Sequence, residues 1–313
     1  MAANVETMFS GNRVVPWHGL GEVVEGTLCS AEAIEKAGLN WQVLSEPIFT
    51  DDGIQIPNYR VNIRDKDRSV LGIVTDRYKI VQNQEAFDFT DSLIGEGCQY
   101  ETAGSLANGK RVFLLAKMPE TKVLGEDFIP YLCFTNSHDG TGAIKAVMTP
   151  VRVVCQNTLN VALSGAKRAW STKHMGDLKS KLEEAKTTLE LAEDYMGKFS
   201  VTADILAHTK ITEDDVEKTL SELYPVNEED SDRKKRNSEE AKNQIRVCML
   251  APDIVKYQNT AYGFLNAASD FATHATPQRM TDTYREKNFA RVLDGHIIID
   301  KVFLDMMAKA KVA

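Results

Sequence analysis

The chain has 313 residues, of which 43% are hydrophobic, and it carries a formal net charge of −8 at pH 7. This composition indicates a globular protein with a sizeable core, and the length allows one large domain or two ordinary ones. No apolar run approaches the roughly eighteen residues that a membrane helix needs, and the N-terminal residues lack the basic start and apolar stretch of a secretory signal. The five cysteines are scattered and never form a CxxC pair, which argues against both a zinc ribbon and a disulfide framework. We therefore expect a cytoplasmic protein with no membrane contact.

The first half of the chain has the pattern of an antiparallel sheet. We predict an N-terminal arm over residues 1–40, followed by a sheet core over residues 41–165 in which β-branched and aromatic runs alternate with turn residues. Asn108-Gly109, between two such runs, is the dipeptide most favourable for a tight hairpin. A stretch from Asn83 to Gly97 has apolar residues at helical spacing and stops at glycine, so we expect one helix packed against the sheet.

Beyond Gly165 the apolar residues recur every three or four positions. Seven of them form a seam on one face of a helix of about seven turns. These seam residues are Leu178, Leu182, Ala185, Leu189, Ala192, Met196 and Phe199. Packing on the protein's own core and pairing with a second chain are both open for this seam.

The remaining segments complete the predicted organisation. Residues 166–226 hold the long helix and an acidic helical region, residues 227–243 are an exposed charged linker, and residues 244–313 form a C-terminal helical region. The sequence therefore predicts an α+β protein: a twisted antiparallel sheet backed by a helix, then a long amphipathic helix and a mostly helical C-terminal half.

Positive charge is concentrated in one window of this acidic chain. From Gly140 to Lys181 there are seven Lys or Arg against the single acid Asp177. A local positive field indicates an anionic partner. Binding a single nucleic-acid strand needs cations that follow the phosphates and flat side chains on which bases stack. The residues that offer this combination are Lys145, Arg152, Lys167, Arg168, Trp170 and Lys173, with Arg77 and Tyr78 as a second cation and ring. Trp170 can equally cap the core where sheet meets helix.

A different class of function is suggested by the turn Ser137-His138-Asp139-Gly140. His138 could act as a base, Asp139 could orient it or bind a metal, and Cys155 could attack a carbonyl. Adjacent side chains on a strand point to opposite faces, however. A structural turn, with Asp139 accepting backbone N–H groups and Gly140 at positive φ, explains the same residues.

Three sequence elements carry a resemblance to a known family. They are PWHGLG (Pro16 to Gly21), VLGIVTDRYKIVQNQEAFDF (Val70 to Phe89), and SHDGTGA followed by TPVRVVCQNTL (Ser137 to Leu159). The chain resembles the phage/plasmid-like protein family that carries the domain of unknown function numbered 932. The resemblance implies a genomic setting in bacteriophages and mobile elements, and no established activity. A fold-level analogy extends to the phage single-strand annealing proteins, whose core is a curved antiparallel sheet backed by a helix.

The sequence leaves three functions open. We expect a phage or mobile-element protein that binds single-stranded nucleic acid, and that anneals complementary strands, as a homo-oligomer without cofactor or metal. The alternatives are a hydrolase or nucleotide-processing enzyme centred on His138 and Asp139, and an interaction protein that counters host defence.

Overall fold

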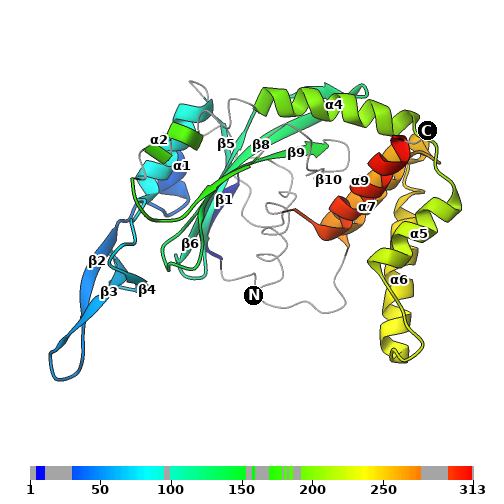
Figure 1. Ribbon diagram of the computed structural model, residues 1–313. Helices are drawn as coiled ribbons and strands as arrows, with labels where there is room; N and C mark the ends of the chain where they lie inside the picture. The colour runs from blue at the N-terminus through cyan, green and yellow to red at the C-terminus, as the bar shows by residue number, and fades with distance from the viewer. Residues whose placement is uncertain are drawn as a thin grey trace.

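The computed structural model describes residues 5–10, 30–94, 99–152, 157–158, 169–177, 180–181, 183–185, 192–275 and 295–311. Its centre is an antiparallel sheet of eight strands in the order β1-β5-β6-β8-β9-β10, with β7 paired to β8 and β11 to β9 (Figure 1). The strands are β1 (Val5–Ser10), β5 (Gln99–Leu106), β6 (Arg111–Lys117), β7 (Thr121–Val123), β8 (Glu126–Ser137), β9 (Ile144–Arg152), β10 (Asn157–Thr158) and β11 (Ala169–Thr172). The predicted α+β class and the mostly helical C-terminal half are confirmed.

The predicted hairpin at Asn108-Gly109 joins two central strands of this sheet. Leu106 of β5 pairs with Arg111 of β6, so four residues form the connection. Asn108 and Gly109 both have positive φ, 58° and 80°. This left-handed backbone is the conformation that asparagine and glycine adopt most readily, which explains why they occupy the turn.

A second, smaller sheet projects from the main one. It has three antiparallel strands, β2 (Val43–Phe49), β3 (Gln55–Arg64) and β4 (Val70–Thr75), in sequence order. Figure 1 shows β2 and β3 extending away from the body as a long hairpin. We call β2, β3 and β4 with their turns the β arm.

Two helices cover one face of the main sheet. These helices are α1 (Ser30–Lys36) and α2 (Asn83–Ile94), and the second is the helix that the sequence predicts. Alternate residues of β6 and β8, among them Leu114 and Phe134, form a buried apolar cluster with Phe87 and Phe89 of α2. The rings of Phe89 and Phe134 lie 5.5 Å apart. Burial of this cluster fixes the helices on the sheet.

The C-terminal half is a helical layer packed on the far end of β8 and β9. Its helices are α4 (Ala192–His208), α5 (Glu213–Leu223), α6 (Asp232–Cys248), α7 (Ala261–His274) and α9 (Ile297–Ala310), with a short 3-10 turn, Val255–Tyr257, before α7. Phe128 of β8 meets Phe199 of α4 at 5.5 Å, and both belong to a second core cluster with residues of α7 and α9. The described part of the chain contains no helix long and apolar enough to cross a bilayer.

The helix that the apolar seam predicts, from Leu178 to Phe199, is helical at each of its described positions. Residues 180–181 and 183–185 are helical, and α4 continues past Phe199 to His208. Between them, residues 186–191 lie outside the described residues. Met196 and Phe199 are buried in the helical core cluster, so this part of the seam packs on the protein's own core.

Two expectations about segment boundaries are wrong. The N-terminal 40 residues are more than an arm, because β1 forms an edge of the main sheet and α1 buries Ala33 and Ile34 in the core. The charged segment 227–243 is not a linker along its whole length, because α6 begins at Asp232.

The charged helix α6 is held by local polar contacts rather than by a broad apolar face. Ser231 caps it by accepting a hydrogen bond from the backbone N–H of Lys234, and Asp230 forms an ion pair with Lys234 at 2.8 Å. Ile245 is fully buried and provides its apolar anchor. Sequence composition alone therefore underestimates the order of this segment.

Candidate functional site

The structure joins two basic segments that are far apart in the sequence. The backbone N–H of Lys79 donates to the carbonyl of His174 at 2.8 Å, and the imidazole Nδ1 of His174 contacts the carbonyl of Lys79 at 2.8 Å. Since a carbonyl only accepts, Nδ1 carries the proton. The rings of Tyr78 and His174 stack at 4.5 Å with an interplanar angle of 14°. The segment before α2 is thereby fixed against the segment after β11.

Exposed cations gather around this contact. Arg77 and Lys79 flank Tyr78, and Lys173 precedes His174; all three side chains are exposed. The Nζ atom of Lys181 donates to the carbonyl of Met175 at 2.7 Å, which brings a fourth cation to the same place. We call Arg77, Lys79, Lys173 and Lys181 the basic junction. No described carboxylate pairs with Arg77, Lys79 or Lys173.

The ring of Tyr78 has a structural role at this junction. Its hydroxyl donates to the carbonyl of Ser137, so it links the junction to the end of β8. Burial, with a smaller contribution from Asp139, raises the pKa of Tyr78 above its ordinary value. Because one face of the ring is occupied by His174, Tyr78 is not an open platform for a nucleic-acid base.

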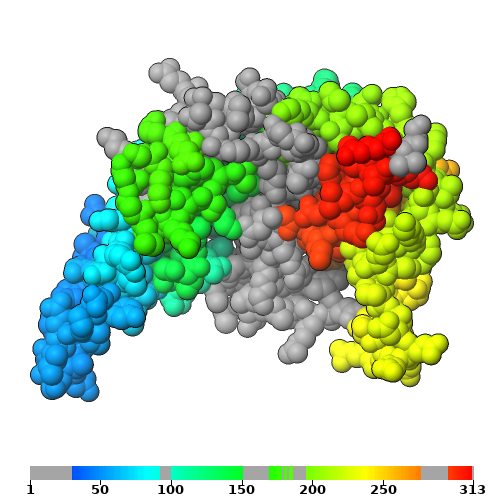
Figure 2. Space-filling model, in the orientation of Figure 1, coloured from blue at the N-terminus to red at the C-terminus, as the bar shows by residue number. Residues whose placement is uncertain are grey.

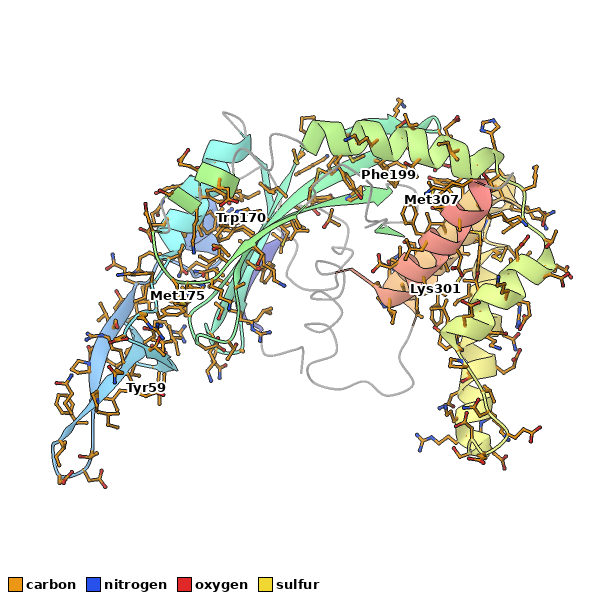
Figure 3. The ribbon with its side chains drawn as sticks, viewed as in Figure 1. Tyr59, Trp170, Met175, Phe199, Lys301 and Met307 are labelled. Carbon is orange, nitrogen blue, oxygen red and sulfur yellow. The ribbon has the colours of Figure 1, made fainter. Side chains whose placement is uncertain are left out.

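Trp170 does not serve as the stacking residue that we expected. Only 7% of its surface is exposed, and it belongs to the apolar cluster beneath α1 and α2 (Figure 3). Trp170 pairs with Ala146 across β11 and β9, which directs it to the covered face of the sheet. The structure supports the alternative that Trp170 caps the core.

The other predicted cations do not form one described cluster with Trp170. Lys145 precedes Ala146 on β9, so its side chain points to the opposite face of the sheet from Trp170. Lys167, Arg168 and Cys155 lie outside the described residues, as does the side chain of Arg152. Of the expected binding residues, the structure therefore brings together Arg77, Tyr78 and Lys173.

The turn that suggested an enzyme has the geometry of a structural turn. One carboxylate oxygen of Asp139 accepts hydrogen bonds from the Ser137 hydroxyl at 2.6 Å, the Thr141 N–H at 2.9 Å and the Thr141 hydroxyl at 2.7 Å. Gly140 has a φ of +77°. Burial of Asp139 by itself raises the pKa of the carboxyl group. The hydrogen bonds outweigh burial, so the pKa lies below its ordinary value.

His138 is fully buried and lies apart from solvent. Its Nε2 contacts the Oδ1 of Asn83 at 3.1 Å, and the edge of its ring meets Trp41 at 5.4 Å. Burial, reinforced by the nearby His174, lowers the pKa of His138 to about 3. A neutral imidazole without access to solvent has no route to a substrate, so this geometry does not favour the catalytic alternative.

His138 belongs to a buried polar cluster that the sequence did not reveal. Asn62 donates its amide to the carbonyl of His138 at 2.8 Å, and Asn136 donates to the carbonyl of Val81 at 2.9 Å. Five buried atoms in this region have no hydrogen-bond partner among the residues that the structure describes: Trp41 Nε1, Asn62 Oδ1, Asn136 Oδ1, His138 Nδ1 and His174 Nε2. These residues come from segments far apart in the chain, so no local spacing could have indicated the cluster. It ties the β arm, α2 and β8 to the basic junction.

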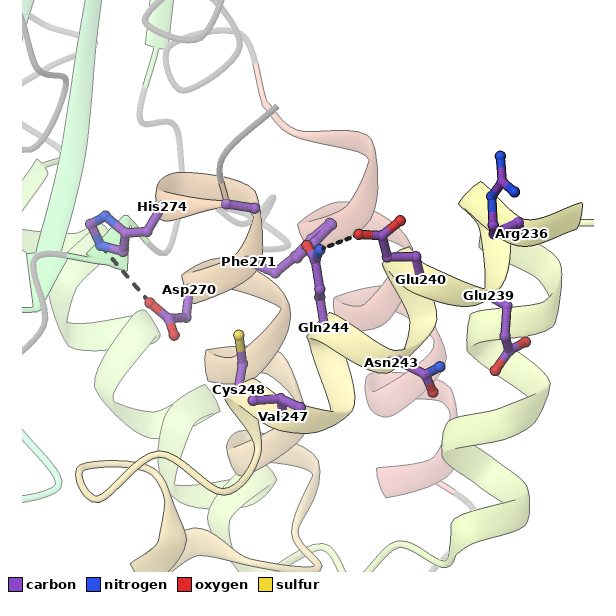
Figure 4. A pocket seen from close by; sticks show the side chains of 11 residues that line it. Arg236, Glu239, Glu240, Asn243, Gln244, Val247, Cys248, Asp270, Phe271 and His274 are labelled. Atoms are coloured by element: carbon purple, nitrogen blue, oxygen red, sulfur yellow. Dashed lines mark hydrogen bonds and ion pairs between the residues drawn. The ribbon is translucent and has the colours of Figure 1, made fainter. Parts of the chain in front are cut away.

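A separate groove of about 870 Å³ lies between α6 and α7 (Figure 4). The groove is lined by Cys248, Asp270 and His274. Their arrangement does not activate the thiol of Cys248, because the carboxylate lies between the thiol and the imidazole. Asp270 lies 4.0 Å from His274 and accepts from Cys248. Burial and this carboxylate raise the pKa of Cys248 to about 12, so the thiol stays protonated. The described residues contain no group of three or more His, Cys, Asp or Glu side chains able to hold a metal ion.

Comparison with known proteins gives one match. The family model described as "Domain of unknown function (DUF932)" matches residues 70–293. No curated protein and no solved structure matches the chain. The match covers β4, the basic junction and most of the helical half.

Proposed function

This chain belongs to the DUF932 family, a domain of unknown function, and we propose that it binds single-stranded nucleic acid through the basic junction. The observation that carries the proposal is the mutual contact of Lys79 and His174, which holds two exposed basic segments together. A partner that bears repeated negative charges would gain from several of these cations at once.

The electrostatic state of the junction supports an anionic ligand. Arg77, Lys79 and Lys173 are exposed and have no carboxylate partner among the described residues. The basic run at the start of α6 differs, because Lys234 there forms an ion pair with Asp230. Charge that is not already neutralised attracts a polyanion more strongly.

The type of contact favours a flexible strand. The four cations lie on two short segments rather than along one helix or ribbon that would fit a duplex groove. A single strand can bend so that successive phosphates reach both segments. No exposed aromatic ring is described at the junction, so we expect phosphate contacts to dominate and sequence preference to be weak. Annealing of complementary strands is the finer form of this proposal.

Fluorescence anisotropy with a labelled single-stranded oligonucleotide tests the proposal. The double variant Lys79→Glu with Lys173→Glu should weaken binding at least about tenfold at low salt. A matched control, Arg233→Glu with Lys235→Glu on α6, changes net charge equally and should leave most of the affinity. Equal losses in both variants would mean that only net charge matters. No loss in the junction variant would refute the assignment of the site.

The same assay separates the finer alternatives. Competition with unlabelled duplex should displace the labelled strand less well than unlabelled single strand does. An annealing assay with two complementary labelled strands should show a faster rate with the wild-type protein than with the junction variant. Tight binding without faster annealing would leave nucleic-acid binding as the function and exclude strand pairing.

A further inference from the structure

Five buried polar side chains meet where the β arm joins the body. They are Trp41, Asn62, Asn136, His138 and His174, all members of the buried polar cluster. Their exposed fractions lie between 0% and 4%. One atom of each has no hydrogen-bond partner among the described residues. Because nearly every buried polar atom in a native protein is paired, five such atoms in one place indicate that a ligand binds there.

Local hydrogen bonds fix the chemical character of the two histidine atoms. The Nε2 of His138 lies 3.1 Å from the Oδ1 of Asn83, and the amide nitrogen of Asn83 donates to the carbonyl of Leu39 at 3.0 Å. Since this Oδ1 only accepts, Nε2 carries the proton of His138 and Nδ1 has an unprotonated lone pair. His174 donates through Nδ1 to the carbonyl of Lys79, so its Nε2 has an unprotonated lone pair as well. Both imidazole nitrogens are therefore acceptors.

The character of the three other atoms is equally definite. The side-chain amide nitrogen of Asn62 donates to the carbonyl of His138 at 2.8 Å, and that of Asn136 donates to the carbonyl of Val81 at 2.9 Å. In both asparagines the remaining atom is Oδ1, which is an acceptor. The Nε1 of Trp41 can only donate. The set therefore consists of four acceptors and one donor.

These atoms come from distant segments but lie around one residue, His138. Its ring centroid is 5.4 Å from that of Trp41, and the amide of Asn62 binds its carbonyl. Asn136 lies two positions earlier in the chain, at the end of β8, and residues two apart on a strand share a face. The charge of His174 acts on His138, so the second imidazole is also near. The five side chains thus lie in one buried region.

Four unpaired acceptors in the core would remove much of the stability of an ordinary domain. Each acceptor gives up its hydrogen bonds to water on folding, and it regains nothing unless a donor reaches it. Several such losses are a large share of the small net free energy that keeps a protein folded. A ligand that supplies donors offsets this cost.

The balance of donors and acceptors selects the ligand. A metal cation or an ammonium ion could bind the four acceptors, but either would leave the indole N–H of Trp41 without an acceptor. The described His, Cys, Asp and Glu side chains also form no group of three able to hold a metal ion. A water molecule both donates and accepts hydrogen bonds, and buried water typically pairs with polar atoms of this kind. Two water molecules supply a donor for each of the four acceptors and an acceptor for the indole.

We propose that the buried polar cluster binds two ordered water molecules, which join the β arm to the end of β8 and to the basic junction. Asn62 belongs to β3 of the arm, His138 follows β8, and His174 is bonded to Lys79 of the junction. The space-filling view shows the arm projecting from the body, so its attachment here sets its orientation (Figure 2). The water bridges add to the direct bond from Asn62 to His138. This site is independent of the nucleic-acid binding proposed for the junction.

A high-resolution crystal structure of the full chain tests this site directly. We expect electron density for two water molecules, each about 2.7–3.2 Å from at least two of the five unpaired atoms. A strong anomalous signal at the site would identify a metal ion and overturn the proposal. Absence of density among the five side chains would overturn it as well.

Nitrogen-15 NMR of the histidine side chains tests the same site in solution. At about pH 8, where histidines are neutral, the Nε2 of His174 should have the chemical shift of a nitrogen that accepts a hydrogen bond from water. His208 is the matched reference, because its Nδ1 also contacts a backbone carbonyl, that of Asp204 at 2.9 Å, while 80% of its side chain is exposed to solvent. Equal Nε2 shifts in His174 and His208 would support bound water. The larger shift of a bare lone pair in His174 would overturn the proposal.

Discussion

Acid should destabilise this protein through the buried imidazole of His138. Burial lowers the pKa of His138 to about 3 in the folded chain, whereas an exposed histidine in the unfolded chain has a value near 6.5. The unfolded state therefore binds a proton first as the pH falls. Stability is complete above about pH 6.5 and is lost progressively between pH 6.5 and pH 3.

The size of this effect follows from the two pKa values. At pH 5 the unfolded histidine is almost fully protonated and the folded one is neutral, so the free energy of unfolding should drop by about 2 kcal/mol relative to neutral pH. Burial also lowers the pKa of His174, which adds a loss of the same sign.

Urea denaturation at several pH values between 7 and 5 measures the effect. His138→Gln removes the titrating group but keeps an amide that can contact Asn83, so its loss of stability on acidification should be smaller by about 2 kcal/mol than that of the wild type. Thr90→Ser, which removes a buried methyl group from α2, serves as a control that lowers stability by about 1 kcal/mol at every pH. An unchanged pH dependence in His138→Gln would refute the assignment of a neutral, buried imidazole.

Three further predictions concern the framework of the fold. Gly72→Ala should lower the free energy of unfolding by about 2 kcal/mol or more in urea titrations, because its Cβ would meet the backbone of Asp139 at 2.5 Å; a neutral result would contradict the close approach. Gly263→Ala should lower the melting temperature strongly, since its Cβ would collide with the carbonyl oxygen of Tyr257, and an unchanged melting temperature would contradict this packing. Ser231→Ala should cost about 1 kcal/mol of stability and speed amide exchange in the first turn of α6, whereas unchanged exchange would argue against the cap.

The parts of the fold that local patterns determine were predictable from the sequence. The Asn108-Gly109 hairpin follows from backbone conformation alone, and α2 follows from an apolar period that ends at glycine. α6 was missed because its stability comes from a cap, ion pairs and one buried anchor, Ile245, which give little apolar signal. The position of the β arm against the end of β8 involves the close approach of Gly72 to Asp139, a contact between distant segments that no local pattern indicates.

The candidate site was predictable only in part. Arg77 and Lys173 were identified as cations, but their association depends on the contact of Lys79 with His174, 95 residues away. Trp170 has the chemistry of a stacking residue, yet strand register directs it into the core. Charge type can be read from a sequence, whereas the face to which a side chain points depends on pairing over long distances.

The salt dependence of oligonucleotide binding tests the central claim most directly. Each phosphate contact on a single strand contributes about −0.7 to the slope of log K against log salt concentration. The neutral variant Lys79→Gln with Lys173→Gln should therefore have a slope shallower by about 1.4 than that of the wild type. A slope identical to that of the wild type would contradict the binding of phosphates at the basic junction.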